Sequence, residues 1–292
     1  MKPLLSLIRV KQWVKNLFLF IPAFFAGILF DSNTLMLLVP GFFSFSFVAS
    51  AIYILNDFRD IEADRNHPKK KSRPLAAGTV SIPVAFVVLG ILLVTGFSIG
   101  YLLSLNYFFV LCIYFSLNLG YSLGLKNISI LDILIVASGF LLRTIAGGLI
   151  LNVPMTNWLL IMVFLLALFM ALAKRLDDFI VNEQDGVISR KTVKHYNLNF
   201  IHSGITMLAG IITVSYIMYT ISDDVKARMH SEHLYFTSIF VVAGILRYLQ
   251  ITLVEMNSGS PTKILLTDKF ILITLAGWVL SFFIIIYSNT VL

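Results

Sequence analysis

Charge and cysteine are both scarce in this chain. Asp, Glu, Lys and Arg make up only 13% of its 292 residues, whereas about a quarter of the residues in a soluble globular domain are charged. This deficit excludes an ordinary soluble domain. The single cysteine, Cys112, excludes a disulfide within the chain and a metal cluster made of cysteines.

Apolar residues take the place of the missing charge. They form 58% of the chain, the mean hydropathy is +0.90, and several runs reach the roughly 20 residues with which a helix crosses a bilayer. The sequence shows no strand-like alternation, and backbone groups in lipid must be paired internally. It therefore predicts an all-α integral membrane protein, a single polytopic domain over residues 1–292. Nine transmembrane helices are expected near residues 14–30, 35–55, 82–104, 107–123, 128–150, 156–173, 200–221, 234–254 and 270–290.

The basic residues are divided unevenly between the two sides of the expected membrane. Of the 22 Lys and Arg residues, only Lys226 and Arg228 fall in connections on one side, while Arg143 and Arg247 fall inside spans. Because bases collect in cytoplasmic loops, the N-terminus is expected in the cytoplasm and the protein in the inner (cell) membrane. The net charge of +7 then reflects these loops and anionic lipid, and no nucleic-acid partner is expected. The long cytoplasmic loops cover residues 56–81, 174–199 and 255–269.

Acidic residues concentrate in one stretch, ILNDFRDIEADRNHPKKKSRPLAAG at residues 54–78. If the second span continues as a helix, Asp57, Asp60 and Asp64 share one face, and Asn56 lies beside them. Like charges on one face repel each other, so this stripe predicts a bound cation, and its oxygen ligands suit Mg²⁺ together with substrate phosphates. The alternative is a charged loop that follows the positive-inside rule, which explains the lysines but not the carboxylates. Phosphate contacts are expected from the bases that follow, Arg65, Lys70 and Arg73.

The pattern N-D-x-x-D-x-x-x-D at the end of a transmembrane helix, followed by R-P, resembles the first aspartate-rich motif of the UbiA superfamily of intramembrane prenyltransferases. Within that superfamily the chain resembles the polyprenyl-phosphate phosphoribosyltransferases. The resemblance implies a UbiA-like bundle of nine helices with cytoplasmic cap loops and, since related enzymes form trimers, a homo-oligomer. Four segments carry it: KQWVKN at 11–16, NDFRDIEADRNHPKKKSRPLAAG at 56–78, YSLGLKNISILDILIVASGFLLRTIAGG at 121–148 and ALAKR at 171–175.

The activity that this resemblance implies is transfer of a 5-phosphoribosyl group from phosphoribosyl diphosphate to a polyprenyl phosphate in the membrane. Diphosphate would leave the anomeric carbon, and Mg²⁺ would stabilise the charge that develops on it. The acceptor phosphate is already an anion, so a dedicated general base is dispensable. The metal ligands implied are Asn56, Asp57, Asp60 and Asp64, and the three aspartates are the expected catalytic residues.

One departure from ordinary prenyltransferases bears on the donor. Those enzymes carry a second aspartate-rich motif, commonly D-x-x-x-D, after the fourth helix, whereas here Asp132 stands alone and residue 136 is Val. This favours one metal-bound diphosphate and a second anion held by bases. Two alternatives stay open. One is a UbiA-type transfer of a prenyl group from prenyl diphosphate to an aromatic or lipid acceptor; the other is a transporter, which the lack of matched inverted repeats disfavours.

The diphosphate, the ribose 5-phosphate and the lipid phosphate all need cationic partners. The first span offers Lys15, which would share a helical face with Lys11, and the neighbouring Asn16; the alternative for both lysines is an interfacial anchor beside Trp13. Charges inside spans are costly and usually functional. Arg143 is therefore a candidate, although it could instead hold neighbouring helices through their carbonyls. The remaining candidate substrate-binding residues are Tyr121, Lys126, Asp132, Lys174, Arg175, Arg247 and Tyr248.

Overall fold

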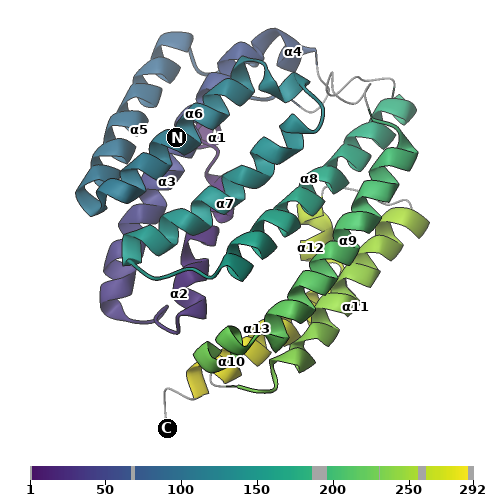
Figure 1. Cartoon of the computed structure of the whole chain (residues 1–292). Helices are drawn as coiled ribbons and strands as arrows, with labels where there is room; N and C mark the ends of the chain where they lie inside the picture. The colour runs from purple at the N-terminus through teal and green to yellow at the C-terminus, as the bar shows by residue number, and fades with distance from the viewer. Residues whose placement is uncertain (1, 67–69, 186–195, 230, 256–260, 289–292) are drawn as a thin grey trace. The chain divides into compact units, whose positions relative to one another are not determined.

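The computed structural model describes residues 2–66, 70–185, 196–229, 231–255 and 261–288, and the chain forms two compact units. Unit 1 contains Met1–Lys126 and Gly139–Met155, and unit 2 contains Asn127–Ser138 and Thr156–Leu292. Every regular element in the described ranges is helical, as predicted (Figure 1). The expectation of a single domain stays a prediction.

Eight segments in the described ranges are long and apolar enough to cross a membrane. Seven of the segments are each formed by one helix, whereas Leu234–Val254 joins three shorter ones: η4 (Leu234–Thr237), α11 (Ser238–Leu249) and the π-helix η5 (Gln250–Val254). The single helices are α3 (Ser32–Arg59), α5 (Ile82–Leu103), α6 (Leu105–Leu123), α7 (Leu131–Leu151), α8 (Asn157–Asp185), α9 (Leu198–Ile221) and α13 (Lys269–Ser288).

The ninth expected span, near residues 14–30, is not one long helix. The chain begins with α1 (Lys2–Leu7), continues as an unusually long 3-10 helix, η1 (Val10–Phe20), and ends in the short α2 (Ile21–Phe25). Pro22 stands at the start of α2, where proline is tolerated because the first N–H groups of a helix have no partner within the helix. The count of nine single spanning helices was therefore too simple for this end of the chain.

The 3-10 geometry of η1 decides which of its side chains face α3. With three residues per turn, every third side chain lies on the same face. The indole nitrogen of Trp13 donates to Ser50 Oγ at 3.0 Å, and the Asn16 amide donates to Ser46 Oγ at 2.8 Å. Lys11 and Lys15, four residues apart, therefore do not share a face, so that expectation was wrong.

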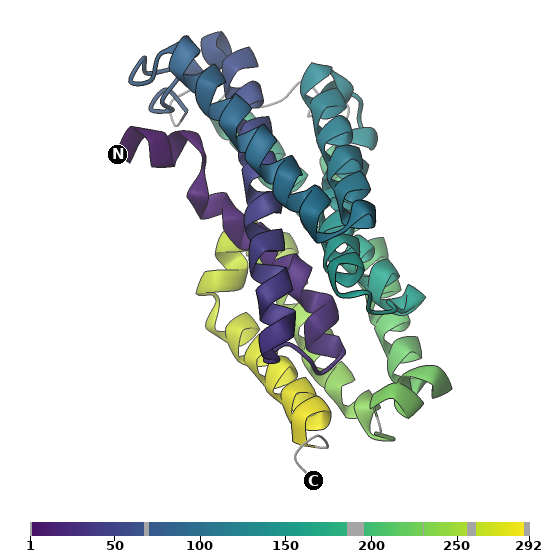
Figure 2. The same cartoon turned by 90° about the vertical axis from the view of Figure 1, so that its left-hand side faces the viewer.

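Close contact between α3 and α5 depends on small residues (Figure 2). The hydroxyl of Ser44 donates to the carbonyl of Gly96 at 2.7 Å. A Cβ atom at Gly96 would stand 2.9 Å from Val48 of α3, and one at Gly100 would stand 3.4 Å from Ser44 Oγ of α3 and 2.5 Å from Leu111 of α6. This G-x-x-x-G pair lets the two backbones approach each other, as in many membrane helix pairs.

The part of α7 that belongs to unit 1 packs against η1 and α3. A Cβ atom at Gly147 would stand 1.9 Å from the Leu19 carbonyl oxygen, and one at Gly41 would stand 2.5 Å from Ile150. Leu19 and Ile150 also belong to the buried apolar cluster of this unit, around Phe45. This packing holds η1 beside the end of α7 that carries Arg143.

Unit 2 is built on helices α8, α9, α11 and α13. Helices α8 and α9 lie side by side, as do α11 and α13 (Figure 1). The core of the unit contains Leu176 from α8, Ile201 and Ile205 from α9, and Tyr248 from α11. The first residues of α7 join this core through Ile133. Two short helices, α10 (Asp223–Met229) and α12 (Pro261–Thr267), complete the unit.

Large apolar side chains are exposed along the membrane helices. On α5, Val87, Ile91 and Val94 follow each other at helical spacing and are each more than 60% exposed, at 63%, 61% and 69%. A stripe of this kind would be unfavourable in water and is expected to face lipid. The polar side chains that could carry chemistry therefore have to be sought at helix ends and inside the units.

Candidate active site

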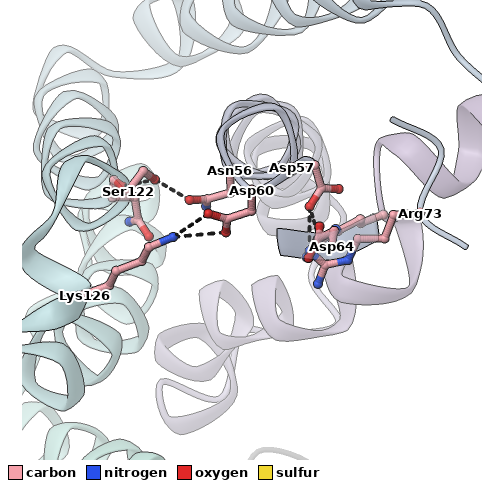
Figure 3. A network of polar contacts seen from close by, with 9 residues as sticks. Asn56, Asp57, Asp60, Asp64, Arg73, Ser122 and Lys126 are labelled. Atoms are coloured by element: carbon pink, nitrogen blue, oxygen red, sulfur yellow. Dashed lines mark hydrogen bonds and ion pairs between the residues drawn. The ribbon is translucent and has the colours of Figure 1, made fainter. Parts of the chain in front are cut away.

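The acidic stretch lies where helix α3 ends. Helix α3 stops at Arg59, Asp60 leaves the helical geometry with φ −97° and ψ 10°, and a separate short helix, α4 (Ile61–Arg65), follows. This break changes the direction of the carboxylates. Figure 3 shows Asp57 and Asp64 directed towards Arg73, and Asp60 directed towards Lys126. One continuous helix with three carboxylates on one face was thus a wrong expectation.

Asp57 and Asp64 are joined by arginine. Both carboxylates are almost fully buried, and Arg73 Nη1 lies 3.0 Å from Asp57 Oδ1 and 2.6 Å from Asp64 Oδ2. Arg9, which precedes η1, donates to the same Oδ1 of Asp57. A turn closed by the Ala77 N–H and the Arg73 carbonyl, at 2.8 Å, holds the backbone of Arg73 in place. Two guanidinium groups therefore balance the two buried carboxylates.

Asn56 and Asp60 face the end of helix α6. Lys126 Nζ lies 2.9 Å and 3.0 Å from the two carboxylate oxygens of Asp60, and Ser122 donates to the amide oxygen of Asn56 at 2.5 Å. Helix α6 is terminated by Gly124, which has a φ of 154° that a residue with a side chain would disfavour. The short helix η2 (Leu125–Asn127) follows and carries Lys126. Ser122 and Lys126 are four residues apart, and together they contact Asn56 and Asp60.

The acidic stretch supplies suitable donors for a magnesium ion, although the described residues contain no group of three His, Cys, Asp or Glu side chains around a single point. Mg²⁺ prefers oxygen ligands and is usually held by one or two carboxylates together with substrate phosphates. The carboxylates of Asp57, Asp60 and Asp64 and the amide oxygen of Asn56 meet that requirement. The present partners of the three carboxylates are cations, and that of Asn56 is the Ser122 hydroxyl, so binding a metal requires these contacts to rearrange.

Arg143 is buried in unit 1 and is held by neutral groups. It donates to Asn16 Oδ1 at 2.7 Å, to the Gly139 carbonyl at 2.7 Å and to the Tyr114 hydroxyl at 2.8 Å. Its guanidinium carbon also lies 5.0 Å from the ring centre of Phe45, within cation–π distance. Arg143 therefore connects α7 to η1 and α6, through side chains and not through the carbonyls of neighbouring helices. Its role as a substrate ligand stays a prediction.

Lys15 lies near this arginine and has no counter-ion in the part of the chain that the structure describes. It is half-buried, and it makes no hydrogen bond or ion pair with the residues that the structure describes. The charged groups that act on it are the guanidinium groups of Arg143 and Arg9. Three cationic side chains in one region favour an anion, which is consistent with a phosphate contact for Lys15.

Unit 2 contains a buried ion pair between α7 and α8. Arg175 Nε lies 3.1 Å from Asp132 Oδ2, and the two side chains are only 2% and 0% exposed. Asp178, one turn further along α8, pairs with the same arginine, and its Oδ2 lies 2.5 Å from Arg175 Nη1. Asp132 and Arg175, both predicted to bind substrate, thus bind each other, and the guanidinium occupies the place between two carboxylates.

Tyr196 fixes the start of α7 to this pair. Its hydroxyl donates to Asp132 Oδ1 at 2.9 Å and accepts the Ile130 N–H at 2.6 Å. Burial raises the pKa of Tyr196 to about 12, so the phenol keeps its proton near neutral pH. Ile130 has a φ of 69°, a costly conformation for a β-branched residue. The tyrosine hydroxyl thus holds a strained backbone turn directly before Asp132.

Arg247 lies beside a cavity of about 860 Å³ within unit 2, whose lining includes Asp268 and Phe270. The arginine is 2.9 Å from Asp268 Oδ2 and 2.7 Å from Glu255 Oε1. The hydrogen bond from Arg247, together with one from the Ile271 N–H, lowers the pKa of the Asp268 carboxyl below its ordinary value. The neighbouring Tyr248 is buried, and its hydroxyl has no hydrogen-bond partner among the described residues.

The other residues predicted to bind substrate are Arg65, Lys70, Tyr121 and Lys174. Arg65 donates to Glu62 at 2.8 Å and to the Ala76 carbonyl at 3.3 Å, so it ties α4 to the following loop. The side chains of Lys70 and Tyr121 are half-buried, and that of Lys174 is exposed. Their roles as substrate ligands stay predictions.

The polar residues of these clusters that sequence reasoning missed include Arg9, Tyr196 and Ser122, as well as Tyr114 beside Arg143 and Asp178 beside Arg175. Arg9 was counted only among the cytoplasmic bases, because nothing in its spacing relates it to Asp57. Tyr196 was missed for the same reason, since it meets Asp132 across 64 residues of chain. Ser122 lies only four residues before Lys126, but α6 ends between them, so helical spacing alone does not place it beside the lysine.

Comparison with known proteins assigns the chain to a family. The model of the UbiA prenyltransferase family matches residues 17–267, which is most of the chain. The chain belongs to the UbiA prenyltransferase family. This UbiA protein is therefore a transferase and a multi-pass membrane protein, in agreement with the prediction from sequence.

Curated relatives of this UbiA protein carry a more specific name. The decaprenyl-phosphate phosphoribosyltransferase of Mycolicibacterium smegmatis is 34% identical and aligns over 94% of this chain and 90% of its own length. The protein of the same name from Corynebacterium glutamicum is 30% identical, over 97% of this chain and 86% of its own length. Both alignments cover nearly the whole chain.

Solved structures of UbiA proteins share the fold. A UbiA homolog from Archaeoglobus fulgidus bound to GPP and Mg²⁺ matches with a TM-score of 0.71 at 19% identity, over 97% of this chain and 99% of its own. A structure of digeranylgeranylglyceryl phosphate synthase matches with a TM-score of 0.66, also at 19% identity, over 99% of this chain and 100% of its own. The all-helical UbiA architecture predicted from the sequence is thereby confirmed.

Proposed function

We propose that this UbiA protein transfers a 5-phosphoribosyl group from phosphoribosyl diphosphate to a polyprenyl phosphate of the decaprenyl phosphate type, and that the reaction depends on Mg²⁺. The observation that carries the proposal is the similarity, over 94% and 97% of the chain, to two relatives named decaprenyl-phosphate phosphoribosyltransferase. We further propose that the acidic stretch faces the cytoplasm of the cell membrane, as the distribution of bases predicts.

The reaction requires one bond to break and one to form at the anomeric carbon of the ribose. The bond from this carbon to diphosphate breaks, its electron pair leaves with diphosphate, and an oxygen of the lipid phosphate forms the new bond. Mg²⁺ held by Asn56, Asp57, Asp60 and Asp64 would supply charge stabilisation for the departing diphosphate. The lipid phosphate needs no deprotonation, so the chain's task is to position two anions.

The basic residues of unit 1 suit the positioning of those anions. Arg9, Arg73 and Lys126 already lie against the acidic stretch, and each is partly exposed. Charge-assisted contacts from arginine to phosphate are strong and directional. In unit 2, by contrast, the guanidinium of Arg175 is taken by Asp132 and Asp178. This favours a single metal–diphosphate site at the acidic stretch over two acidic metal sites.

The direct test is an assay with purified protein in detergent and defined substrates. With Mg²⁺, labelled phosphoribosyl diphosphate and decaprenyl phosphate, we expect a labelled lipid product and release of diphosphate, and no product when the metal is chelated. A parallel reaction with prenyl diphosphate and an aromatic acid should give none. Product only in the parallel reaction would replace the proposal with prenyl transfer.

Lys15→Ala is expected to raise the apparent KM for phosphoribosyl diphosphate by about ten- to a hundredfold, the usual loss for one charge-assisted contact. The KM for the polyprenyl phosphate should change far less. The reason is the position of Lys15, which has no counter-ion among the described residues and faces two guanidinium groups. Initial rates over a matrix of both substrate concentrations measure the two constants.

The matched control is Lys11→Ala, which removes the same charge from an exposed position on the same 3-10 helix. We expect its kinetic constants to stay close to those of the unmodified protein. Equal increases of both KM values in Lys15→Ala would mean that the lysine only orders the helices around Arg143.

A further inference from the structure

Asp57 is shared by two arginines that come from different parts of unit 1. Arg9 precedes η1, and Arg73 follows α4, yet both contact the same oxygen, Oδ1 of Asp57. Arg73 continues to Asp64 at 2.6 Å, as the close-up in Figure 3 shows. These four side chains carry two positive and two negative charges, and the carboxylates are the buried partners.

The same carboxylates are the proposed metal ligands, which creates a conflict. A divalent cation bound to Asp57 and Asp64 would lie within a few ångströms of two guanidinium groups and be repelled by them. The oxygens that accept from the arginines also lose part of their capacity to bind a metal. The ion pairs must therefore open when a metal is bound.

Opening the ion pairs would leave the buried carboxylates unpaired, which is costly unless the metal takes the place of the arginines. The displaced arginines are then available to another anion. Diphosphate oxygens are well suited, since guanidinium groups bind them with paired hydrogen bonds. The side chains of Arg9 and Arg73 are 22% and 28% exposed, so their ends can move without unpacking the core. The backbone beside Arg9 is fixed, because Ser50 Oγ donates to the Ile8 carbonyl at 2.7 Å.

We propose that Arg9 and Arg73 act as built-in counter-ions that compete with the divalent cation for Asp57 and Asp64, and that they move to the diphosphate when it binds. Metal and diphosphate then bind cooperatively, because each removes an obstacle to the other. Arg9 thereby becomes an anion-binding residue. The inference rests on the metal–diphosphate site of the proposed function, but not on the sugar or the lipid.

The proposal predicts opposite effects of one substitution on two ligands. In Arg9→Gln, Mn²⁺ alone should bind about five- to tenfold more tightly than in the unmodified protein, because one competing cation is gone. Labelled inorganic pyrophosphate alone, in the presence of chelator, should bind about tenfold more weakly, because one anion contact is lost; both changes lie in the usual range of coupling between sites. Electron paramagnetic resonance of free Mn²⁺ and equilibrium dialysis of pyrophosphate measure the two affinities on the full-length protein.

Arg59→Gln is the matched control, since Arg59 is an exposed arginine in the last turn of α3, and it should change neither affinity. Arg9→Lys, which keeps the charge but not the planar group, should lie between Arg9→Gln and the unmodified protein and serves if Arg9→Gln fails to fold. Unchanged or weaker Mn²⁺ binding in the folded Arg9 variants would overturn the inference alone. Absence of both Mn²⁺ and pyrophosphate binding in the unmodified protein would overturn the metal–diphosphate site as well.

Discussion

Replacing Asp60 with asparagine is expected to lower the rate of phosphoribosyl transfer by about 10²- to 10³-fold, as the loss of one group that acts on developing charge commonly does. The side chain of Asp60 is 35% exposed, and Lys126 is its ion-pair partner. Asparagine has the same shape and removes only the charge. The protein should therefore stay folded while it loses metal-dependent activity, which initial rates over a range of Mg²⁺ concentrations measure.

The control for this substitution is Glu62→Gln, the same chemical change two residues further on. The Glu62 side chain is 83% exposed and pairs with Arg65 at the surface. We expect nearly full activity in this variant. If Asp60→Asn kept more than a third of the activity, the acidic stretch would have no catalytic role at this position. The lysine–aspartate pair would then be only a link between η2 and the end of α3.

The second large effect is expected on stability, from the buried pair in unit 2. Arg175→Met leaves Asp132 buried and without its cation, and removing one partner of such a pair costs about 3–5 kcal/mol. Asp132→Asn should have a smaller effect of the same sign, because Asp178 still binds the arginine. Thermal unfolding in detergent should show a lower midpoint for Arg175→Met, by about 5–15 °C for a chain of this size.

A double substitution separates the ion pair from the packing. In Asp132→Asn/Arg175→Met no unpaired charge is left at Asp132, so most of the loss should be recovered. Arg247→Met is the comparison on the outside of the same unit, where the ion pair with Asp268 is partly exposed and solvent weakens it. A shift in Arg247→Met as large as that in Arg175→Met would show that burial is not the cause.

The two clusters of ion pairs have different consequences for function. At the end of α3 the arginines and Lys126 are 22–28% exposed, so substrates can reach them. Around Arg175 the charges are almost completely buried. The first cluster can exchange its partners at moderate cost, whereas the second is suited to hold α7, α8 and Tyr196 in a fixed arrangement.

The sequence by itself determined the class of protein and most of the membrane helices. The expected spans 82–104, 107–123 and 234–254 differ by two residues at most from the helical segments found. Long apolar runs are local properties, and in lipid they have no alternative to a helix. The acidic stretch and Lys126 were also found from sequence, because spacing within one helix or turn decides which side chains are neighbours.

Only the tertiary structure decided how the charged residues pair. Helix α3 ends before Asp60, which turns this aspartate to Lys126 and leaves Asp57 and Asp64 to Arg73. The contacts of Arg9 with Asp57 and of Arg143 with Asn16 bridge 48 and 127 residues of chain. Residue type and spacing do not specify such partners, because a buried charged side chain pairs with whichever oppositely charged or polar group the tertiary packing places beside it.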